Sequence, residues 1–323
     1  MTRRARVAAR AGATLAVVAA STLMWAAPAH AAAATINVSE AQLSYTAAAG
    51  QDNHLIIGNV TGSPDTYVFF EAGGIPITST DSACWHSDPN YSNIMACTLP
   101  GLAKIVVDVR DGGDAVVNFS DAPTLMYGGD GDDYLWLGGR TGTQSRGYGQ
   151  AGNDHIMSGP GDDIMDGGAG ADTAAYLDSL DPVVASLVTN TGTRSYDTDT
   201  FYSMENLTGG GGADVLYGND ARNVISGGWG KVCTTRGGYS CTYVDGDDTL
   251  YGGGADDKLY AGLGHDTVYG GAGNDQIFGD RGNDYLLGEG GDDLLDGGSG
   301  TDNINGGPGY DACSGETLTA CES

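Results

Sequence analysis

Aspartate recurs at every ninth residue through much of the C-terminal half of this chain of 323 residues. The clearest run reads GGAGNDQIF at 270–278, GDRGNDYLL at 279–287, GEGGDDLLD at 288–296 and GGSGTDNIN at 297–305. These nonapeptides follow the pattern Gly-Gly-x-Gly-x-Asp-x-apolar-x, with one carboxylate at position 6. Acid placed once per repeat, rather than in one acidic block, is typical of oxygen ligands for a hard cation.

The other repeat positions indicate how such a carboxylate is held. Glycine at positions 1, 2 and 4 allows positive φ and close backbone approach, so six residues form a tight turn with carbonyls directed inward. Positions 7 to 9 are expected to be extended, with position 8 pointing inside and positions 7 and 9 facing water. The predicted interior residues are Leu135, Ile156, Met165, Leu216, Ile225, Leu250, Leu259, Val268, Ile277, Leu286, Leu295 and Ile304.

Two nonapeptides make one coil of turn, strand, turn and strand, so like turns stack every 18 residues at about 4.8 Å. One predicted column of carboxylates is Asp248, Asp266, Asp284 and Asp302, and the other is Asp257, Asp275, Asp293 and Asp311. Carboxylates this close repel unless a cation lies between them. Calcium takes six to eight oxygens in forgiving geometry, whereas magnesium requires a tighter octahedron.

The spacing therefore predicts multiple Ca²⁺ sites. No catalytic residue is predicted. The predicted metal ligands are Asp133, Asp154, Asp163, Asp172, Asp214, Asp248, Asp257, Asp266, Asp275, Asp284, Asp293, Asp302 and Asp311. The turn at 218–226 is degenerate because Asn223 stands where Asp is expected.

These repeats resemble the RTX, or haemolysin-type, calcium-binding nonapeptide family, and the chain is similar to small secreted actinobacterial proteins that carry them. Gly-Gly-x-Gly-x-Asp occurs without departure at 128, 167, 209, 270, 297 and 306. The resemblance covers a little over half of the chain, between 128 and 314. It implies an all-β fold, a parallel β-roll or β-solenoid with two nonapeptides per coil, and carries the ligand role to Asp at position 6 and to carbonyls of the turn. The sequence departs from the family pattern in the turn of Asp257, where Ala255 replaces the third glycine, and in that of Asp172, where Ala174 weakens the core position.

Residues 1–31 have the features of a secretory signal peptide, with arginines before an apolar stretch and an Ala-x-Ala cleavage site ending at Ala31. Removing its four arginines takes the formal net charge from −28 to −32. The remaining chain contains no other stretch apolar enough to span a bilayer. We therefore expect a secreted, extracellular protein.

The rest of the chain divides by repeat content. Residues 32–120 predict short strands, at 36–45, 54–60, 66–70 and 75–78, that form a β-rich N-terminal cap and first coils; a separate β-sandwich is the alternative. Calcium-binding repeats follow at 121–175 and 208–314, the second interrupted by a disulfide loop near 231–245. Between them, 176–207 reads as two degenerate coils or as an insertion. Residues 315–323 form a C-terminal tail.

Six cysteines remain after cleavage, and six allow fifteen pairings. Proximity favours Cys84–Cys97, Cys233–Cys241 and Cys313–Cys321. Export permits such disulfides. Zinc is the weaker alternative, because no C-x2-C pair and no suitably spaced histidine accompany these cysteines.

Composition bears on partners and activity. The negative net charge argues against nucleic acid as a partner, because the sequence offers no basic patch that could offset phosphate charge. The sequence lacks a His-Glu-x-x-His or Gly-x-Ser-x-Gly motif, so catalysis is disfavoured, although a polysaccharide lyase, epimerase or hydrolase on a β-helix is the alternative function.

Tyr251 and Tyr269 are expected to stack on one face, either to stabilise the sheet or as a sugar-binding stripe. The favoured function is calcium-driven extracellular folding of a structural or adhesive surface or matrix protein, with cell-surface or matrix polysaccharide as a candidate partner.

Overall fold

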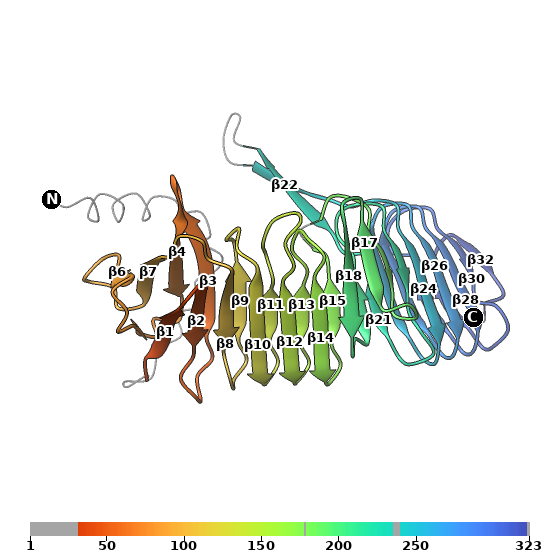
Figure 1. The fold of residues 1–323 in the computed structure, drawn as a ribbon. Coiled ribbons are helices and arrows are strands. Elements are labelled where there is room, and N and C mark those ends of the chain that lie inside the picture. Colours follow the sequence, from red (N-terminus) through yellow and green to blue (C-terminus); the bar gives the residue numbers. More distant parts are fainter. Residues whose placement is uncertain (1–31, 178, 235–239, 322–323) are drawn as a thin grey trace. The chain divides into compact units, whose positions relative to one another are not determined.

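A computed structural model describes residues 32–177, 179–234 and 240–321 of the chain, and of residues 231–234 and 240–242 it describes the backbone alone. The described residues form strands and turns, with no helix among them. The chain folds as two compact units, one ending at Gly170 and one starting at Ala171. Figure 1 shows the strands in chain order. The predicted signal peptide lies outside the described residues.

The first unit contains two sheets in which the repeat strands run parallel. One sheet has the order β5 (Ile77–Thr78), β1 (Ala34–Ser39), β2 (Gln42–Thr46), β8 (Lys104–Asp108), β10 (Thr124–Asp130), β12 (Arg146–Ala151) and β14 (Ile164–Ala169). The other has the order β6 (Cys84–His86), β7 (Ile94–Thr98), β4 (Ser63–Glu71), β3 (His54–Val60), β9 (Ala115–Asn118), β11 (Tyr134–Trp136) and β13 (His155–Met157).

The N-terminal region joins these sheets through parallel pairs. Strand β2 pairs with β8, and β3 pairs with β9. The single strand expected over 36–45 is wrong: it is an antiparallel hairpin, β1 and β2, because Glu40 takes a positive φ of 46° and reverses the chain. Further antiparallel pairs, β3 with β4 and β4 with β7, fill the rest of the region.

The second unit repeats the two-sheet arrangement. Its first sheet has the order β18 (Asp197–Tyr202), β17 (Thr191–Arg194), β16 (Val184–Ser186), β20 (Val215–Tyr217), β24 (Thr249–Gly254), β26 (Thr267–Ala272), β28 (Tyr285–Gly290), β30 (Asn303–Asn305) and β32 (Thr317–Thr319). Its second has the order β15 (Thr173–Ala175), β19 (Asn206–Thr208), β21 (Val224–Ser226), β25 (Lys258–Leu263), β27 (Gln276–Arg281), β29 (Leu294–Asp296) and β31 (Ala312–Ser314).

Register in the second unit follows the 18-residue coil. Leu250 in β24 is paired with Val268 in β26, which is paired with Leu286 in β28. All the side chains predicted at position 8 are fully buried. This confirms the parallel β-roll with two nonapeptides per coil.

Three segments differ from the repeat. Residues 184–202 form an antiparallel meander of β16, β17 and β18 within the first sheet. The interruption near 231–245 is an antiparallel hairpin, β22 (Gly230–Thr234) and β23 (Ser240–Val244), visible in Figure 1. The expected tail contains strand β32, paired in parallel with β30, so the roll continues beyond residue 314.

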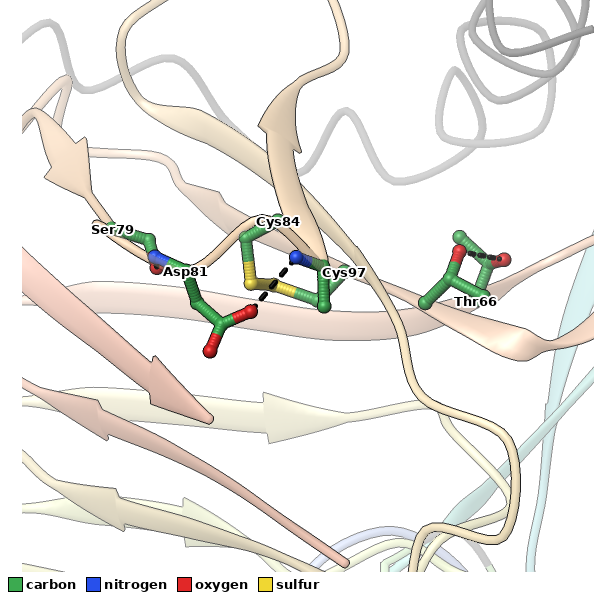
Figure 2. The surroundings of a disulfide bond; sticks show 7 residues. Thr66, Ser79, Asp81, Cys84 and Cys97 are labelled. Carbon is green, nitrogen blue, oxygen red and sulfur yellow. Dashed lines mark hydrogen bonds between the residues drawn. A yellow bond between two sulfur atoms is a disulfide. The ribbon is translucent and has the colours of Figure 1, made fainter. Parts of the chain in front are cut away.

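Two of the three predicted disulfides join described residues, Cys84 to Cys97 and Cys313 to Cys321. Figure 2 shows the first beside Asp81, whose carboxylate accepts a hydrogen bond from the Ala83 N–H at 2.8 Å. The side chains of Cys233 and Cys241 lie outside the described part, although their backbones are partners in the β22–β23 hairpin.

Candidate metal centre

The position-6 aspartates of the second unit stack in the two expected columns. The Asp248 N–H donates to Asp266 Oδ1 at 2.7 Å, and the Asp266 N–H donates to Asp284 Oδ1 at 2.9 Å. In the other column, the Asp257 N–H donates to Asp275 Oδ1 at 2.8 Å. Each carboxylate is thus fixed by one oxygen to the coil before it.

The second carboxylate oxygen, Oδ2, lacks such a hydrogen bond in many of these turns. This Oδ2 atom is buried and has no hydrogen-bond partner in a series of turns: Asp114, Asp133, Asp248, Asp257, Asp266, Asp275, Asp284, Asp293 and Asp302. A buried, unsatisfied carboxylate oxygen is costly, and native proteins rarely leave such groups unpaired. Within each column of the second unit this feature repeats every 18 residues, which indicates sites built for a cation.

Main-chain oxygens converge on the same places. A Cβ added at Gly270 would overlap Asp275 Oδ2 and crowd the Gly288 carbonyl oxygen of the next coil. Glycine is also needed at Gly273, in position 4 of the same turn, because it has φ +131° and a Cβ there would overlap the Ala255 carbonyl. The glycines therefore bring carboxylate and carbonyl oxygens together, and an oxygen-only donor set suits Ca²⁺.

No group of three or more His, Cys, Asp or Glu side chains at metal-binding spacing occurs within the described ranges. A roll of this kind supplies few carboxylates to any one point, because each turn contributes one position-6 side chain. Main-chain carbonyls would have to complete the coordination. The unpaired Oδ2 atoms and the converging carbonyls fit such a site, in which bound Ca²⁺ would neutralise the stacked carboxylates.

Burial also changes the acidity of these groups. Burial raises the pKa of Asp248 to about 9, and its like-charged neighbours Asp214, Asp245 and Asp266 add to the effect. Burial likewise raises the pKa of Asp266 to about 7 and that of Asp284 to about 6. Without a metal, Asp248 therefore holds its proton at neutral pH, and Asp266 is partly protonated there.

In three turns, a main-chain N–H of the same turn donates to a side-chain oxygen at position 6, and these are called closed turns here. The Gly210 N–H donates to Asp214 Oδ2 at 2.6 Å, and the Gly159 N–H donates to Asp163 Oδ2 at 3.0 Å. At the degenerate turn, the Asn219 N–H donates to Asn223 Oδ1 at 2.8 Å. In the turns with an unpaired Oδ2, position 2 is left-handed, as at Gly271 with φ +111°. Its N–H then turns away from the carboxylate.

Asp114 is a further candidate ligand that the strict repeat pattern does not select. Its turn has left-handed residues at positions 2 and 4, Arg110 (φ 74°) and Gly112 (φ 116°), and its N–H donates to Asp133 Oδ1 at 2.8 Å. Its Oδ2 is buried without a partner, and burial raises its pKa to about 7. Val109 and Arg110 replace the first two glycines, so Asp-Gly-Gly-Asp at 111–114 is the signal that remains.

The other predicted ligands are also buried at position 6. Asp154 Oδ1 accepts the Asp133 N–H at 2.9 Å, and Asp311 Oδ1 accepts the Asp293 N–H at 2.9 Å. The Asp172 N–H donates to Glu205 Oε2 at 2.9 Å, so a glutamate carboxylate stands in for the next aspartate there. Metal ligation by the predicted aspartates stays a prediction.

The expected tyrosine stacking is confirmed. Tyr251 lies between Tyr217 and Tyr269, with ring centroids 4.7 and 4.8 Å apart and nearly parallel planes. Each face of the central ring is thus covered by a neighbouring ring. This arrangement favours stabilisation of the sheet over stacking of a sugar on the ladder.

Fold and site together define a parallel β-roll of the calcium-binding type. The family described as the RTX calcium-binding nonapeptide repeat (4 copies) matches residues 125–139, 146–174, 203–231, 243–277 and 278–312. Residues 125–312 therefore carry the repeats of this family, and the roll belongs to it.

Other comparisons add little. No curated protein matches the chain. Among solved structures, the extracellular lipase LipA from Serratia marcescens matches with 18% identity and a TM-score of 0.18, over 66% of this chain and 35% of the lipase. The chain thus spans about a third of that protein's length. No helix long and apolar enough to cross a membrane occurs among the described residues.

Proposed function

We propose that this is a secreted calcium-binding protein whose roll folds outside the cell when Ca²⁺ occupies the stacked turns. The supporting observation is the recurrent buried Oδ2 without a partner, as at Asp266 and Asp284. Inside a calcium-poor cell, repulsion between stacked carboxylates within each column and the entropy of a glycine-rich chain oppose folding. A ligand that binds only the folded chain stabilises it by mass action.

Far-UV circular dichroism of the mature chain tests this proposal. Titration with Ca²⁺ is expected to produce a cooperative gain of β signal, and Mg²⁺ at the same concentrations is expected to produce much less, because it holds its water and requires an octahedron. A chain that is fully folded in chelator and unchanged by Ca²⁺ would contradict the proposal.

The role of the folded roll is proposed to be structural or adhesive, at a cell surface or in a matrix, with polysaccharide as partner. Support comes from a cavity of about 850 Å³ lined partly by Trp229, Tyr243, Asp280 and Arg281. Trp229 and Tyr243 are exposed and meet edge to face, with centroids 4.9 Å apart at 86°. Trp229 is 45% exposed and Tyr243 is 58% exposed, and both lie beside polar groups that can bond sugar hydroxyls.

Retention on insoluble cell-wall polysaccharide tests the adhesive role. The calcium-loaded protein is expected to be retained, and Trp229→Ala is expected to reduce retention, while Tyr269→Ala in the ladder leaves it unchanged. Equal retention of all three proteins, or none of the wild type, would count against polysaccharide binding at this cavity.

A further inference from the structure

The beginning of the second unit satisfies its buried acidic groups differently from the coils that follow. The base segment is defined here as residues 179–226, and the calcium coils as residues 246–314. We propose that the base segment folds without calcium and forms the base on which the calcium coils assemble when Ca²⁺ binds. This inference rests on the proposed function.

The first observation is an internal cation. Arg194 Nε lies 2.8 Å from Asp197 Oδ1, and Arg194 Nη2 lies 3.4 Å from Asp199 Oδ2, with these side chains at most 1% exposed. The guanidinium also lies 5.2 Å from the centre of the Tyr176 ring. A fixed protein cation therefore pairs with both buried carboxylates of this meander and offsets one of their two negative charges.

The second observation is the closed turn at Asp214. Its Oδ1 accepts the Val183 N–H at 2.8 Å, and its Oδ2 accepts the Gly210 N–H at 2.6 Å. By contrast, Asp284 accepts the Asp266 N–H through Oδ1 while its Oδ2 is buried without a partner. Asp214 thus has a protein donor on each oxygen, so its folding does not require a metal.

The third observation is the amide at Asn223, which occupies the ligand position of the next turn. Its Oδ1 accepts the Asn219 N–H, and its Nδ2 donates to the Glu205 carbonyl oxygen at 2.7 Å. Both polar atoms of the neutral Asn223 amide are thus hydrogen-bonded within the protein, without a metal. The substitution also removes one charge from the column.

The apolar core supports the same conclusion. Phe201 of the base segment is among the largest fully buried side chains, and its ring centroid lies 6.4 Å from that of Tyr176, just before the segment. Val183, Ala185 and Leu187 are buried nearby in sequence. The calcium coils instead bury mainly one aliphatic residue per nonapeptide, at position 8, and the last nonapeptide has the half-buried Cys313 there. More apolar surface is thus removed from water in the base segment, and such burial is the main force that opposes chain entropy.

Hydrogen exchange of the full mature chain, followed by mass spectrometry with and without Ca²⁺, tests this inference. In chelator, amides of the base segment are expected to exchange slowly and those of the calcium coils rapidly; added Ca²⁺ should protect the coils. Equally rapid exchange of both segments in chelator would overturn the inference, and so would equally slow exchange.

A matched pair of variants gives a second readout. The number of bound ions, measured by equilibrium dialysis, is expected to fall in Asp284→Asn and to be unchanged in Asp214→Asn. An equal fall in both variants would overturn the assignment of the closed turn. If the wild-type chain bound no Ca²⁺ at all, the proposed function would fail, whereas the exchange pattern in chelator would still test the base segment by itself.

Discussion

The main-chain N–H of Asp266 donates to Oδ1 of Asp284, 18 residues later, at 2.9 Å. This bond fixes the Asp284 carboxylate across the gap between two coils. It leaves Oδ2 of the same side chain buried and unpaired. One side chain therefore both sets the register of the roll and presents an oxygen to a cation.

Asp284→Asn is expected to weaken calcium-dependent stability while leaving the calcium-free chain little changed or more stable. The amide keeps an oxygen for the Asp266 N–H but removes the charge. A lost site that was filled at about a hundred times its Kd corresponds to about 2.7 kcal/mol. Thermal unfolding with and without Ca²⁺ measures this. Asp296→Asn, the same change at an exposed residue, is the control. Equal effects of both variants would argue against Asp284 as a ligand.

Asp114→Asn is expected to reduce the number of bound calcium ions, although this residue precedes the family match at 125. Its turn has the left-handed residues and the unpaired Oδ2 of the later turns. Calorimetric titration of the variant measures the count. Asp121→Asn changes an exposed aspartate nearby and should bind as the wild type does. An unchanged count in Asp114→Asn would restrict the sites to the matched repeats.

Leu286→Ala is expected to destabilise the calcium-loaded roll by about 2–5 kcal/mol, because it removes a fully buried side chain and leaves a cavity. Leu294→Ala is the matched control, since Leu294 is 44% exposed and should cost far less. Denaturant unfolding of both variants in excess Ca²⁺ provides the comparison. A similar loss in both would mean that position 8 does not carry the core.

Strict periodicity made much of this fold predictable. Spacing alone placed Leu250 and Val268 inside and Asp266 above Asp284, because stacked coils repeat one local geometry. Turn conformation was harder to predict. Gly210 and Gly271 both occupy position 2, yet only Gly271 is left-handed, and the difference decides whether the N–H reaches the carboxylate.

The irregular parts depended on contacts that no repeat encodes. The reversal at Glu40, the Arg194 ion pairs and the strand β32 each arise from pairing with a particular neighbour. Asp302 illustrates this: its N–H donates to Glu316 Oε2 at 3.0 Å, so a glutamate outside the pattern continues the column. The position of Asp302 was predictable from the repeat, whereas its partner was not.

The stability of the calcium-free roll is expected to fall as pH rises, the reverse of its calcium affinity. Burial raises the pKa of Asp284 to about 6, that of Asp266 to about 7 and that of Asp248 to about 9, from an ordinary value of 3.8. A carboxyl whose pKa is higher in the folded than in the unfolded chain stabilises the fold fully below the unfolded pKa. That contribution is lost as pH rises through the folded pKa. In chelator, the folded fraction of the roll, measured by far-UV circular dichroism, should therefore fall as pH rises from about 4 to about 9. Calcium affinity should increase over the same interval, because the ligands must lose their protons. Calcium-free stability that is flat or rises with pH would show that these carboxyls are not held protonated in the roll.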